Sequence, residues 1–519
     1  MKNYKYFLLA AMGLMAVPSL AQETYQDTKM AENGLNGTAR YVGMGGAMEA
    51  LGADISTISS NPAGIGLFRR NQVSISGGVV AQTDAETSIK YNNSGIDIKG
   101  DKSHVSFDQV GIVWSPTRGR SSYLNLAFNY HKSTDFGQIL SAANSLGGAS
   151  QGKLTSIKYA AFNGQQGANM VWTGVDANYE NLMTKSDDGK SMSYYDGSEF
   201  LFGQYQKGYI GEYDFNISGS LNNRVWLGLT VGLHDVNYRS NSMYAENLDG
   251  GATSDQYEEL RIDGTGFDVK AGIIFRPVEE SPFRIGAYFN TPVYYDLTLK
   301  GASDLILKDG DQRGDNGNTC TYDYRLNTPW KVGVSLGHTV GNYLALGATY
   351  EYAWYDHMDN RIKDGGYYDG WDGGYYETSS SDDVMNDNTC YSLKGVSTVK
   401  LGLEYKPVSM LAIRLGYNYV SPMFKEEGYR DQSIASPGTA YATSSDYTNW
   451  KATNRITAGV GFNYSNWAFD VAYQYSMQKG DFYPFMSYYG DNKADDCVAP
   501  VTEVKNNRHQ VLMTLSYKF

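Results

Sequence analysis

Apolar and polar residues alternate with a period of two in many short segments of this 519-residue chain. In residues 467–476, one face is aromatic or apolar and the other is small or polar. The apolar face consists of Trp467, Phe469, Val471, Tyr473 and Tyr475. The pattern recurs in residues 124–131, 225–232 and 411–419. Alternation at about 180° per residue predicts half-buried β-strands. A sandwich of two sheets alternates in the same way, so the fold class needs a second argument.

The length of the connectors supplies that argument. Fourteen strands follow from the pattern, at residues 72–81, 107–115, 123–132, 209–221, 225–237, 264–276, 283–295, 329–340, 343–355, 396–405, 411–419, 456–464, 467–477 and 509–519. Short connectors such as Gly341–Asn342 alternate with long ones, the longest being the 76 residues between Lys132 and Tyr209. An even strand number, alternating short and long connectors, and tyrosines at strand ends are typical of outer-membrane barrels. The sequence predicts an all-β fold, a 14-stranded antiparallel transmembrane β-barrel.

The composition fits this fold and excludes others. The formal net charge is −13, which argues against a nucleic-acid partner because phosphate binding needs a basic surface. A mean hydropathy of −0.44 does not exclude the membrane, since lumen-facing residues offset lipid-facing ones in a barrel. Three cysteines, Cys320, Cys390 and Cys497, fall in long external loops. Three cysteines allow one disulfide, and their spacing does not say which pair would form it.

The two ends of the chain carry targeting patterns. Lys2 and Lys5 precede an apolar run at residues 7–17, and small residues follow, which predicts a signal peptide cleaved between Ala21 and Gln22. The last strand alternates and ends in Tyr517 and Phe519, and this ending resembles the assembly signal of bacterial outer-membrane proteins. We therefore expect export to the outer membrane of a Gram-negative bacterium, with the barrel-assembly machinery and outer-membrane lipid as partners.

A barrel of about fourteen strands is too wide for its own side chains to fill, so something must block its lumen. The spare sequence lies between the signal peptide and the first strand. It is rich in small residues, with single charges at Arg40 and Asp54 and a turn signal at Asn61-Pro62. The expected division is a signal peptide at 1–21, an N-terminal hatch at 22–71 and a barrel at 72–519.

The hatch region resembles a known family. Gly-Thr-Ala-Arg at 37–40, Gly-Gly-Ala at 45–47, Ala-Asp at 53–54 and Asn-Pro-Ala-Gly at 61–64 look like the hatch of FadL/TodX-type outer-membrane transporters. The resemblance implies passive transport of long-chain fatty acids or other hydrophobic compounds. It also implies that ligand binding shifts the hatch and opens a lateral exit through the barrel wall. Asn61, Pro62, Ala63 and Gly64 are then the hatch hinge.

A long loop and the histidines offer further candidate sites. Phe136, Ile139, Leu140 and Leu146 recur at near-helical spacing in the longest loop, as a ligand-landing surface or as packing onto the rim. The six histidines are scattered. We interpret His131 and His234 as polar wall residues, with haem binding as the functional alternative.

Three classes of function remain open: a transporter of hydrophobic molecules, an enzyme in a barrel, and a haem or other nutrient receptor or general porin. The hatch favours the first, so we predict a non-enzymatic protein that has a hydrophobic small-molecule ligand and acts as a monomer. No cofactor and no metal site is expected. A lumen lined by apolar residues would support the transporter, and converging acidic and basic rows would support the porin.

Overall fold

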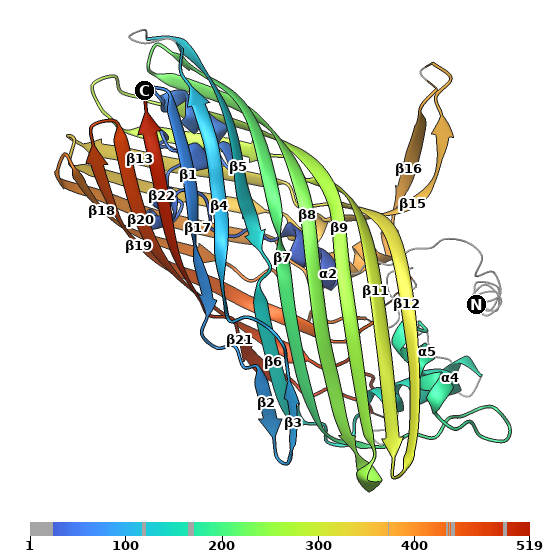
Figure 1. The fold of residues 1–519 in the computed structure, drawn as a ribbon. Helices are drawn as coiled ribbons and strands as arrows, with labels where there is room; N and C mark the ends of the chain where they lie inside the picture. Colours follow the sequence, from blue (N-terminus) through green and yellow to red (C-terminus); the bar gives the residue numbers. More distant parts are fainter. Residues whose placement is uncertain are drawn as a thin grey trace.

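The computed structural model describes residues 24–116, 121–163, 171–371, 373–431, 434, 436, 442–490 and 496–519. The predicted cleavage site at Ala21 and Gln22 lies outside these residues. Within them, the chain folds into a long antiparallel barrel that contains its own N-terminal segment (Figure 1). No helix of the described part is long and apolar enough to cross a membrane.

Fourteen strands of the described chain close the barrel, as predicted. In order around the wall they are β1 (Gln72–Gln82), β4 (Ser103–Trp114), β5 (Tyr123–Asp135), β7 (Gly197–Leu221), β8 (Val225–Leu248), β9 (Thr253–Phe275), β10 (Arg284–Asn290), β13 (Lys331–Val340), β14 (Leu344–Ala353), β17 (Val396–Val408), β18 (Leu411–Val420), β19 (Tyr447–Tyr464), β20 (Trp467–Tyr483) and β22 (Arg508–Lys518). Antiparallel pairing of β22 with β1, from Lys518 opposite Gln72 to Arg508 opposite Gln82, closes the ring.

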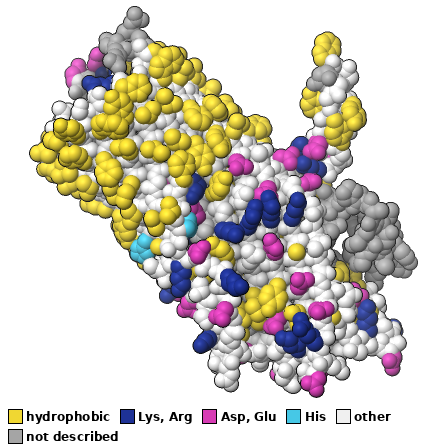
Figure 2. Space-filling model, in the orientation of Figure 1, with side chains coloured by type: hydrophobic (Ala, Val, Ile, Leu, Met, Phe, Trp, Pro, Cys, Tyr) yellow, Lys and Arg dark blue, Asp and Glu magenta, His cyan; other side chains and the backbone are white. Residues whose placement is uncertain are grey.

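An apolar belt surrounds the end of the barrel that has the short turns (Figure 2). The belt consists of outward-facing, exposed side chains such as Ile75 on β1, Ile217 on β7, Leu229 on β8, Val334 on β13, Leu415 on β18 and Leu515 on β22. A closed sheet with an outward apolar band is the only β-structure that satisfies its backbone groups within lipid. The protein is therefore an integral outer-membrane barrel.

Beyond the belt, several strands continue as a polar extension. Leu233 of β8 faces outward in the belt, whereas Asn241 of the same strand faces outward in the extension, where Tyr238 points inward and is buried. Two further long strands, β11 (Tyr294–Asp309) and β12 (Gln312–Asn327), widen this part. The expectation of loops at 238–263 and 296–328 is therefore wrong, because both segments form long β-hairpins.

The remaining strands are short, and all except one projecting hairpin lie toward the far end (Figure 1). They are β2 (Ser88–Tyr91), β3 (Ser94–Asp97), β6 (Gln138–Ser145), β15 (Asp359–Tyr368), β16 (Tyr375–Ser381) and β21 (Thr502–Lys505). Strands β15 and β16 form a hairpin that projects away from the barrel (Figure 1). Residues of the predicted landing surface belong to the packing of this end: Phe136, Leu140 and Leu146 are buried in apolar clusters.

The helices fall into two groups. The N-terminal segment contains α2 (Thr24–Ala31), α3 (Ala39–Gly43) and the 3-10 turns η1 (Ile55–Ser59) and η2 (Pro62–Leu67). The others lie beyond the belt and are α4 (Gln151–Phe162), α5 (Gly174–Leu182), η3 (Asp249–Gly251), η4 (Tyr355–His357) and α6 (Asp383–Ser392). The three cysteines are unpaired; Cys497 is buried and its thiol donates to the carbonyl of Ser150 at 3.3 Å.

Candidate functional site: the occupied lumen and its cavity

The N-terminal segment rests directly on glycines of the barrel wall. The wall glycines whose Cβ would lie against atoms of the segment include Gly228 on β8, Gly272 on β9, Gly337 on β13, Gly347 on β14, Gly402 on β17 and Gly416 on β18. The last four are direct register neighbours on consecutive strands. Only a residue without a side chain permits such close approach of two backbones.

Buried ion pairs fix the segment to the same wall. The Arg40 guanidinium donates from Nε to Glu404 Oε2 at 3.0 Å, and Glu404 also accepts from Arg414 at 2.6 Å. On the other side of the segment, Glu49 Oε1 accepts from Lys400 Nζ at 2.8 Å. These charges are paired with one another, so they hold the segment rather than line an open aqueous pore. Arg40 thus contacts the wall directly.

Asp54 instead stabilises the segment from within. Its carboxylate accepts from the Thr38 hydroxyl at 2.8 Å and from Ser56 N at 3.0 Å, which caps η1. A carboxylate at the start of a helical turn satisfies amide donors that have no partner inside the turn. This residue therefore has a structural role in the segment.

The Asn61–Gly64 turn lies where the segment meets β8 and β9. The Asn61 side chain caps η2 by accepting from Ala63 N at 3.2 Å. Its amide donates to Glu49 O at 3.2 Å within the segment and to Ile273 O at 3.4 Å on β9. Pro62, Ala63 and Gly64 are fully or almost fully buried at this contact. One side chain therefore joins the turn, the segment and the wall.

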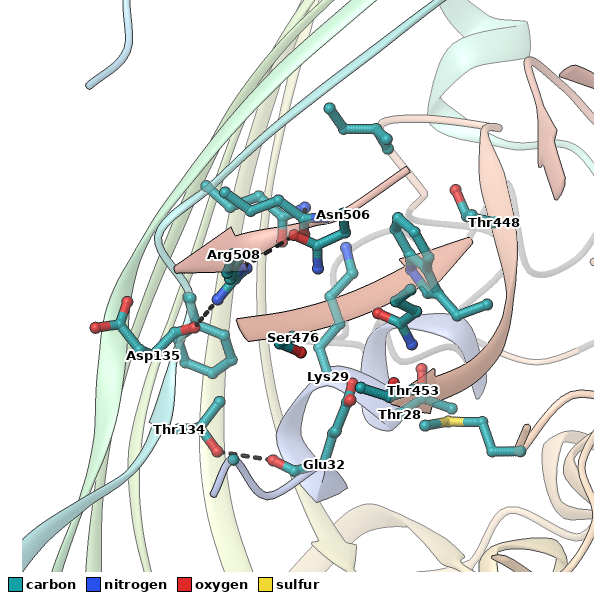
Figure 3. A pocket seen from close by; sticks show the side chains of 18 of the residues that line it. Thr28, Lys29, Glu32, Thr134, Asp135, Thr448, Thr453, Ser476, Asn506 and Arg508 are labelled. Atoms are coloured by element: carbon teal, nitrogen blue, oxygen red, sulfur yellow. Dashed lines mark hydrogen bonds between the residues drawn. The ribbon is translucent and has the colours of Figure 1, made fainter. Parts of the chain in front are cut away.

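A cavity of about 210 Å³ lies in the lumen beside α2, between that helix and the wall strands β5, β19, β20 and β22 (Figure 3). Polar and charged side chains make up much of its surface. Lining residues include Lys29, Glu32, Lys132, Asp135, Arg430, Asp446, Arg455, Gln474, Ser476, Gln478, Arg508 and Gln510. The apolar lining that would support a transporter makes up only part of this cavity.

Two arginines in the cavity stand side by side on the wall. Arg455 on β19 and Arg508 on β22 are both register partners of Ser476 on β20, one on each side. Their guanidiniums donate to neutral groups: Arg455 to Asn418 Oδ1 at 2.9 Å, and Arg508 to Asn506 Oδ1 and the Asp135 carbonyl, both at 3.0 Å. Across the described residues, no carboxylate lies within 4 Å of either guanidinium.

Glu32, directly after α2, is one of the acidic residues of the cavity, with Asp135 and Asp446. Burial raises the pKa of the Glu32 carboxyl, and Arg455 and Arg508 act in the opposite direction. Its carbonyl accepts from the Thr134 hydroxyl at 2.7 Å (Figure 3). Neither guanidinium forms an ion pair with Glu32 in the described structure, so both point their charge at the cavity without a carboxylate in contact.

Aromatic side chains form another part of the cavity. Tyr25 of α2 stacks on Phe424 with ring centroids 5.1 Å apart and lies equally close to Tyr447. Trp450 and Met423 continue this surface. The cavity therefore combines a cationic row on β19 and β22 with an apolar aromatic surface, which is the arrangement that suits a molecule with an anionic head and an apolar tail.

The C-terminal residues lie at the seam of the barrel. Tyr517 pairs with Val73 of β1 and with Trp467 of β20, and Phe519 N donates to Asn71 O at 3.0 Å. The Tyr517 ring lies 4.6 Å from that of Trp467. Their role as an assembly signal stays a prediction.

The fold and the lumen define a class of protein: a membrane-spanning β-barrel whose interior is occupied by its own N-terminal segment, with a cavity beside it. A crystal structure of a Pseudomonas aeruginosa FadL homologue has this fold, with a TM-score of 0.51, 13% identity, and coverage of 94% of this chain and 99% of the other. The sequence-based resemblance to FadL/TodX-type transporters is confirmed by this shared fold.

Two further solved structures are similar over nearly their whole length. The Ralstonia pickettii toluene transporter TbuX gives a TM-score of 0.48 at 13% identity, with 93% of this chain and 99% of that chain covered. The Pseudomonas putida toluene transporter TodX gives 0.47 at 12% identity, with the same coverage. No family model and no curated protein matches the sequence.

Proposed function

We propose that this protein is a passive outer-membrane channel for long-chain fatty acids or similar hydrophobic molecules. The observation that carries the proposal is the cavity beside α2, where Arg455 and Arg508 lie next to the aromatic surface of Tyr25 and Phe424. The FadL homologue that shares the fold supports a transporter of this class.

The chemistry of the cavity favours an amphipathic anion over a neutral hydrocarbon. A carboxylate placed between the two guanidiniums gains charge-assisted hydrogen bonds. The tail gains about 0.8 kcal/mol for each CH₂ group that leaves water. A neutral aromatic hydrocarbon would gain only the free energy of burying its apolar surface and would leave both guanidiniums without an anionic partner.

In this proposal the N-terminal segment is a hatch that moves when the ligand binds. The ligand arrives from the polar extension and enters the cavity, and α2 and Glu32 respond to it because they form one side of the cavity. Asn61, Pro62, Ala63 and Gly64 act as the hinge, with Asn61 bonded to both the segment and β9. The ligand then leaves sideways through the wall into the outer-membrane lipid.

Uptake of labelled long-chain fatty acid tests the proposal. The assay uses cells that lack their own transporter and make this protein, beside cells with the empty vector, at matched surface abundance. We expect uptake in the wild type, a fall in the Asn61→Ala, Pro62→Ala variant, and a fall in the Arg455→Gln, Arg508→Gln variant. Arg313→Gln, at an exposed hairpin end, is the matched control and should transport normally.

A parallel assay with labelled toluene separates the ligand classes. If the arginine variant loses fatty-acid uptake but not toluene uptake, the guanidiniums recognise the acid group. Absence of fatty-acid uptake from a correctly assembled wild type would refute the fatty-acid proposal. Haem and aromatic hydrocarbons would then be the next ligands to assay.

A further inference from the structure

Six ionisable side chains gather inside the barrel wall, next to the hatch turn and away from the cavity. They are His131 on β5, Glu212 and Asp214 on β7, His234 on β8, and Asp268 and Lys270 on β9. Each is at most 7% exposed. No part of the proposed transport mechanism uses this cluster.

The register of the strands brings the cluster together. His131, Glu212 and His234 are direct neighbours across β5, β7 and β8. In the next row, Asp214 and Asp268 flank Gly232, where a Cβ would lie 2.7 Å from Lys270 Nζ. The glycine thus leaves room for the ammonium to reach the carboxylates.

The cluster carries excess negative charge. Lys270 Nζ lies 2.5 Å from Glu212 Oε1, 3.1 Å from Asp214 Oδ1 and 2.8 Å from Asp268 Oδ1. Three carboxylates against one ammonium leave a formal charge of −2 while both imidazoles are neutral. Among the described residues, no basic side chain other than Lys270 and these imidazoles lies within 4 Å of the three carboxylates. A buried net charge of this size must be offset, either by protons taken up by the cluster or by a bound cation.

Several ligand atoms in the cluster have no hydrogen-bond partner in the described structure. They are both ring nitrogens of His234, Nδ1 of His131 and Oδ2 of Asp214. Buried polar atoms are nearly always satisfied, so four unsatisfied atoms in one cluster require an explanation. Lys270 occupies one oxygen of each carboxylate and leaves the second oxygens of Glu212 and Asp214 directed toward His131.

We propose that this cluster binds one divalent transition-metal ion of the Zn²⁺ type, with Glu212 as the shared ligand. The ligand atoms of His131, Glu212 and Asp214 lie within 4.8 Å of one another, as do those of Glu212, His234 and Asp268. His131 Nε2 and Glu212 Oε2 are 3.4 Å apart, and so are His234 Nε2 and Asp268 Oδ1. A tetrahedral Zn²⁺ with N and O ligands needs separations of about 3.3 Å.

The donor set also selects the kind of metal. Imidazole with carboxylate suits zinc and other first-row transition metals, whereas Ca²⁺ and Mg²⁺ take oxygen ligands. A charge of +2 balances the formal charge of −2, and Lys270 stays in contact with one oxygen of each carboxylate, including the Asp268 oxygen that faces His234. The ion would be a resident structural metal of the wall.

The metal site lies close to the wall glycines that contact the hatch turn. The row of Asn216, Thr230 and Lys270 adjoins the row that contains Gly228 and Gly272. Those two glycines contact Pro62 and Asn61 of the hatch turn. A bound metal therefore ties together the three wall strands on which the turn rests.

Metal analysis of purified, tag-free protein in detergent tests the site. The protein is stripped with a chelator, dialysed against Zn²⁺ or Ca²⁺, freed of unbound ions and assayed by mass spectrometry of metals. We expect one Zn²⁺ per chain and no retained Ca²⁺. His131→Gln, His234→Gln should lose the Zn²⁺, and His357→Gln, on an exposed turn, should keep it.

A second variant and a second measurement distinguish loss of the metal site from misfolding. Glu212→Gln keeps the shape of the shared ligand and should weaken Zn²⁺ binding by at least about 100-fold, the upper range for loss of even an outer-shell partner. Zn²⁺, but not Ca²⁺, should raise the melting temperature of the stripped wild type, because an ion that binds the folded state stabilises it. A folded wild type that retains no Zn²⁺, or a Glu212→Gln variant that retains it unchanged, would overturn the proposal.

Discussion

At the scale of single residues, the inward glycines of the wall determine where the hatch can sit. Gly347 faces the Ala47 carbonyl, and its Cβ would lie 3.1 Å from Ala47 C and 3.2 Å from Leu51 Cδ1. The neighbouring atom is backbone, which cannot rotate away as a side chain can. Any side chain here must therefore push the hatch off the wall or distort β14.

Gly347→Ala should loosen the hatch. Overpacking of a tight contact costs about 1–3 kcal/mol, so the free energy of unfolding falls by that amount and the hatch becomes accessible to protease. Denaturant unfolding in detergent, with limited proteolysis of the N-terminal segment, measures both effects. Gly370→Ala is the control, since no atom lies within 4 Å of a Cβ there. Equal behaviour of the two variants would contradict the close-contact argument.

The residues that the sequence identifies are those whose role depends on their neighbours along the chain. Asn61 and Pro62 are recognisable because a helix N-cap and a turn each depend on residues that are adjacent in the sequence. Arg455 and Arg508 were missed because they meet only through their common neighbour Ser476 on β20. His131 and His234 looked scattered for the same reason: Glu212 joins them across three strands. Spacing along the chain does not contain this information, whereas register does.

At the scale of elements, alternation located all fourteen wall strands but ended several of them too early. On β8 the apolar face turns from outside to inside between Leu233 and Tyr238, where the strand leaves the belt. Lipid requires apolar residues outside, and water beyond the belt requires them inside. The strand continues through this change. A prediction that follows the apolar residues of one face, however, ends the strand at this point.

The docking of α4 on the far end of β8 involves a buried carboxyl group, that of Glu246. Glu246 of β8 is 1% exposed and accepts from Gln151 N, at the start of α4, at 2.8 Å and from Tyr244 Oη at 2.7 Å. Burial raises the pKa of Glu246 from 4.5 to about 7. Its second oxygen has no hydrogen-bond partner within the described structure, which fits a protonated carboxyl.

This raised pKa predicts that α4 docks more firmly in acid. The folded state holds a proton that the unfolded state releases between pH 4.5 and 7, so the stabilisation is complete below pH 4.5 and lost as pH rises through 7. The full difference is about 3 kcal/mol. Amide hydrogen exchange of α4, corrected for intrinsic rates, should be slower at pH 5 than at pH 8 in the wild type.

Glu246→Gln is the variant that isolates this effect. It keeps a carbonyl acceptor for Gln151 N and removes the titrating group, so the exchange of α4 should lose its dependence on pH. Glu259→Gln, exposed on β9, is the control and should behave as the wild type does. A pH dependence that survives in Glu246→Gln would assign the effect to another group.

At the scale of the whole molecule, the hatch is held in the lumen by close contacts with wall glycines, by ion pairs and by hydrogen bonds to several wall strands. The pairs Arg40–Glu404 and Glu49–Lys400 both have their wall partner on β17, while the Asn61 contact is to β9. Tight backbone contact and hydrogen bonds from wall side chains such as Tyr123, Arg284 and Asn418 to carbonyls of the segment give it a well-defined position.

A reversible cross-link between hatch and wall tests whether movement is needed for transport. Gly43 of α3 and Gly459 of β19 approach each other so that a Cβ on either lies 3.3 Å from the Cα of the other. This proximity allows the Cβ separation of about 3.5–4.5 Å that a disulfide needs. Gly43→Cys, Gly459→Cys, in a chain with Cys320 and Cys390 changed to serine, should form the bond in the oxidising cell envelope.

With the bond closed, fatty-acid uptake should fall to the level of empty cells, and reduction with dithiothreitol should restore it, because the hatch is then free to leave β19. Each single cysteine variant controls for the substitution itself and should transport in both conditions. Formation of the bond is checked by mass spectrometry of the linked peptides. If a fully cross-linked protein transports as well as the reduced one, the ligand passes without any displacement of α3 from the wall, and the hatch is a fixed plug beside the path.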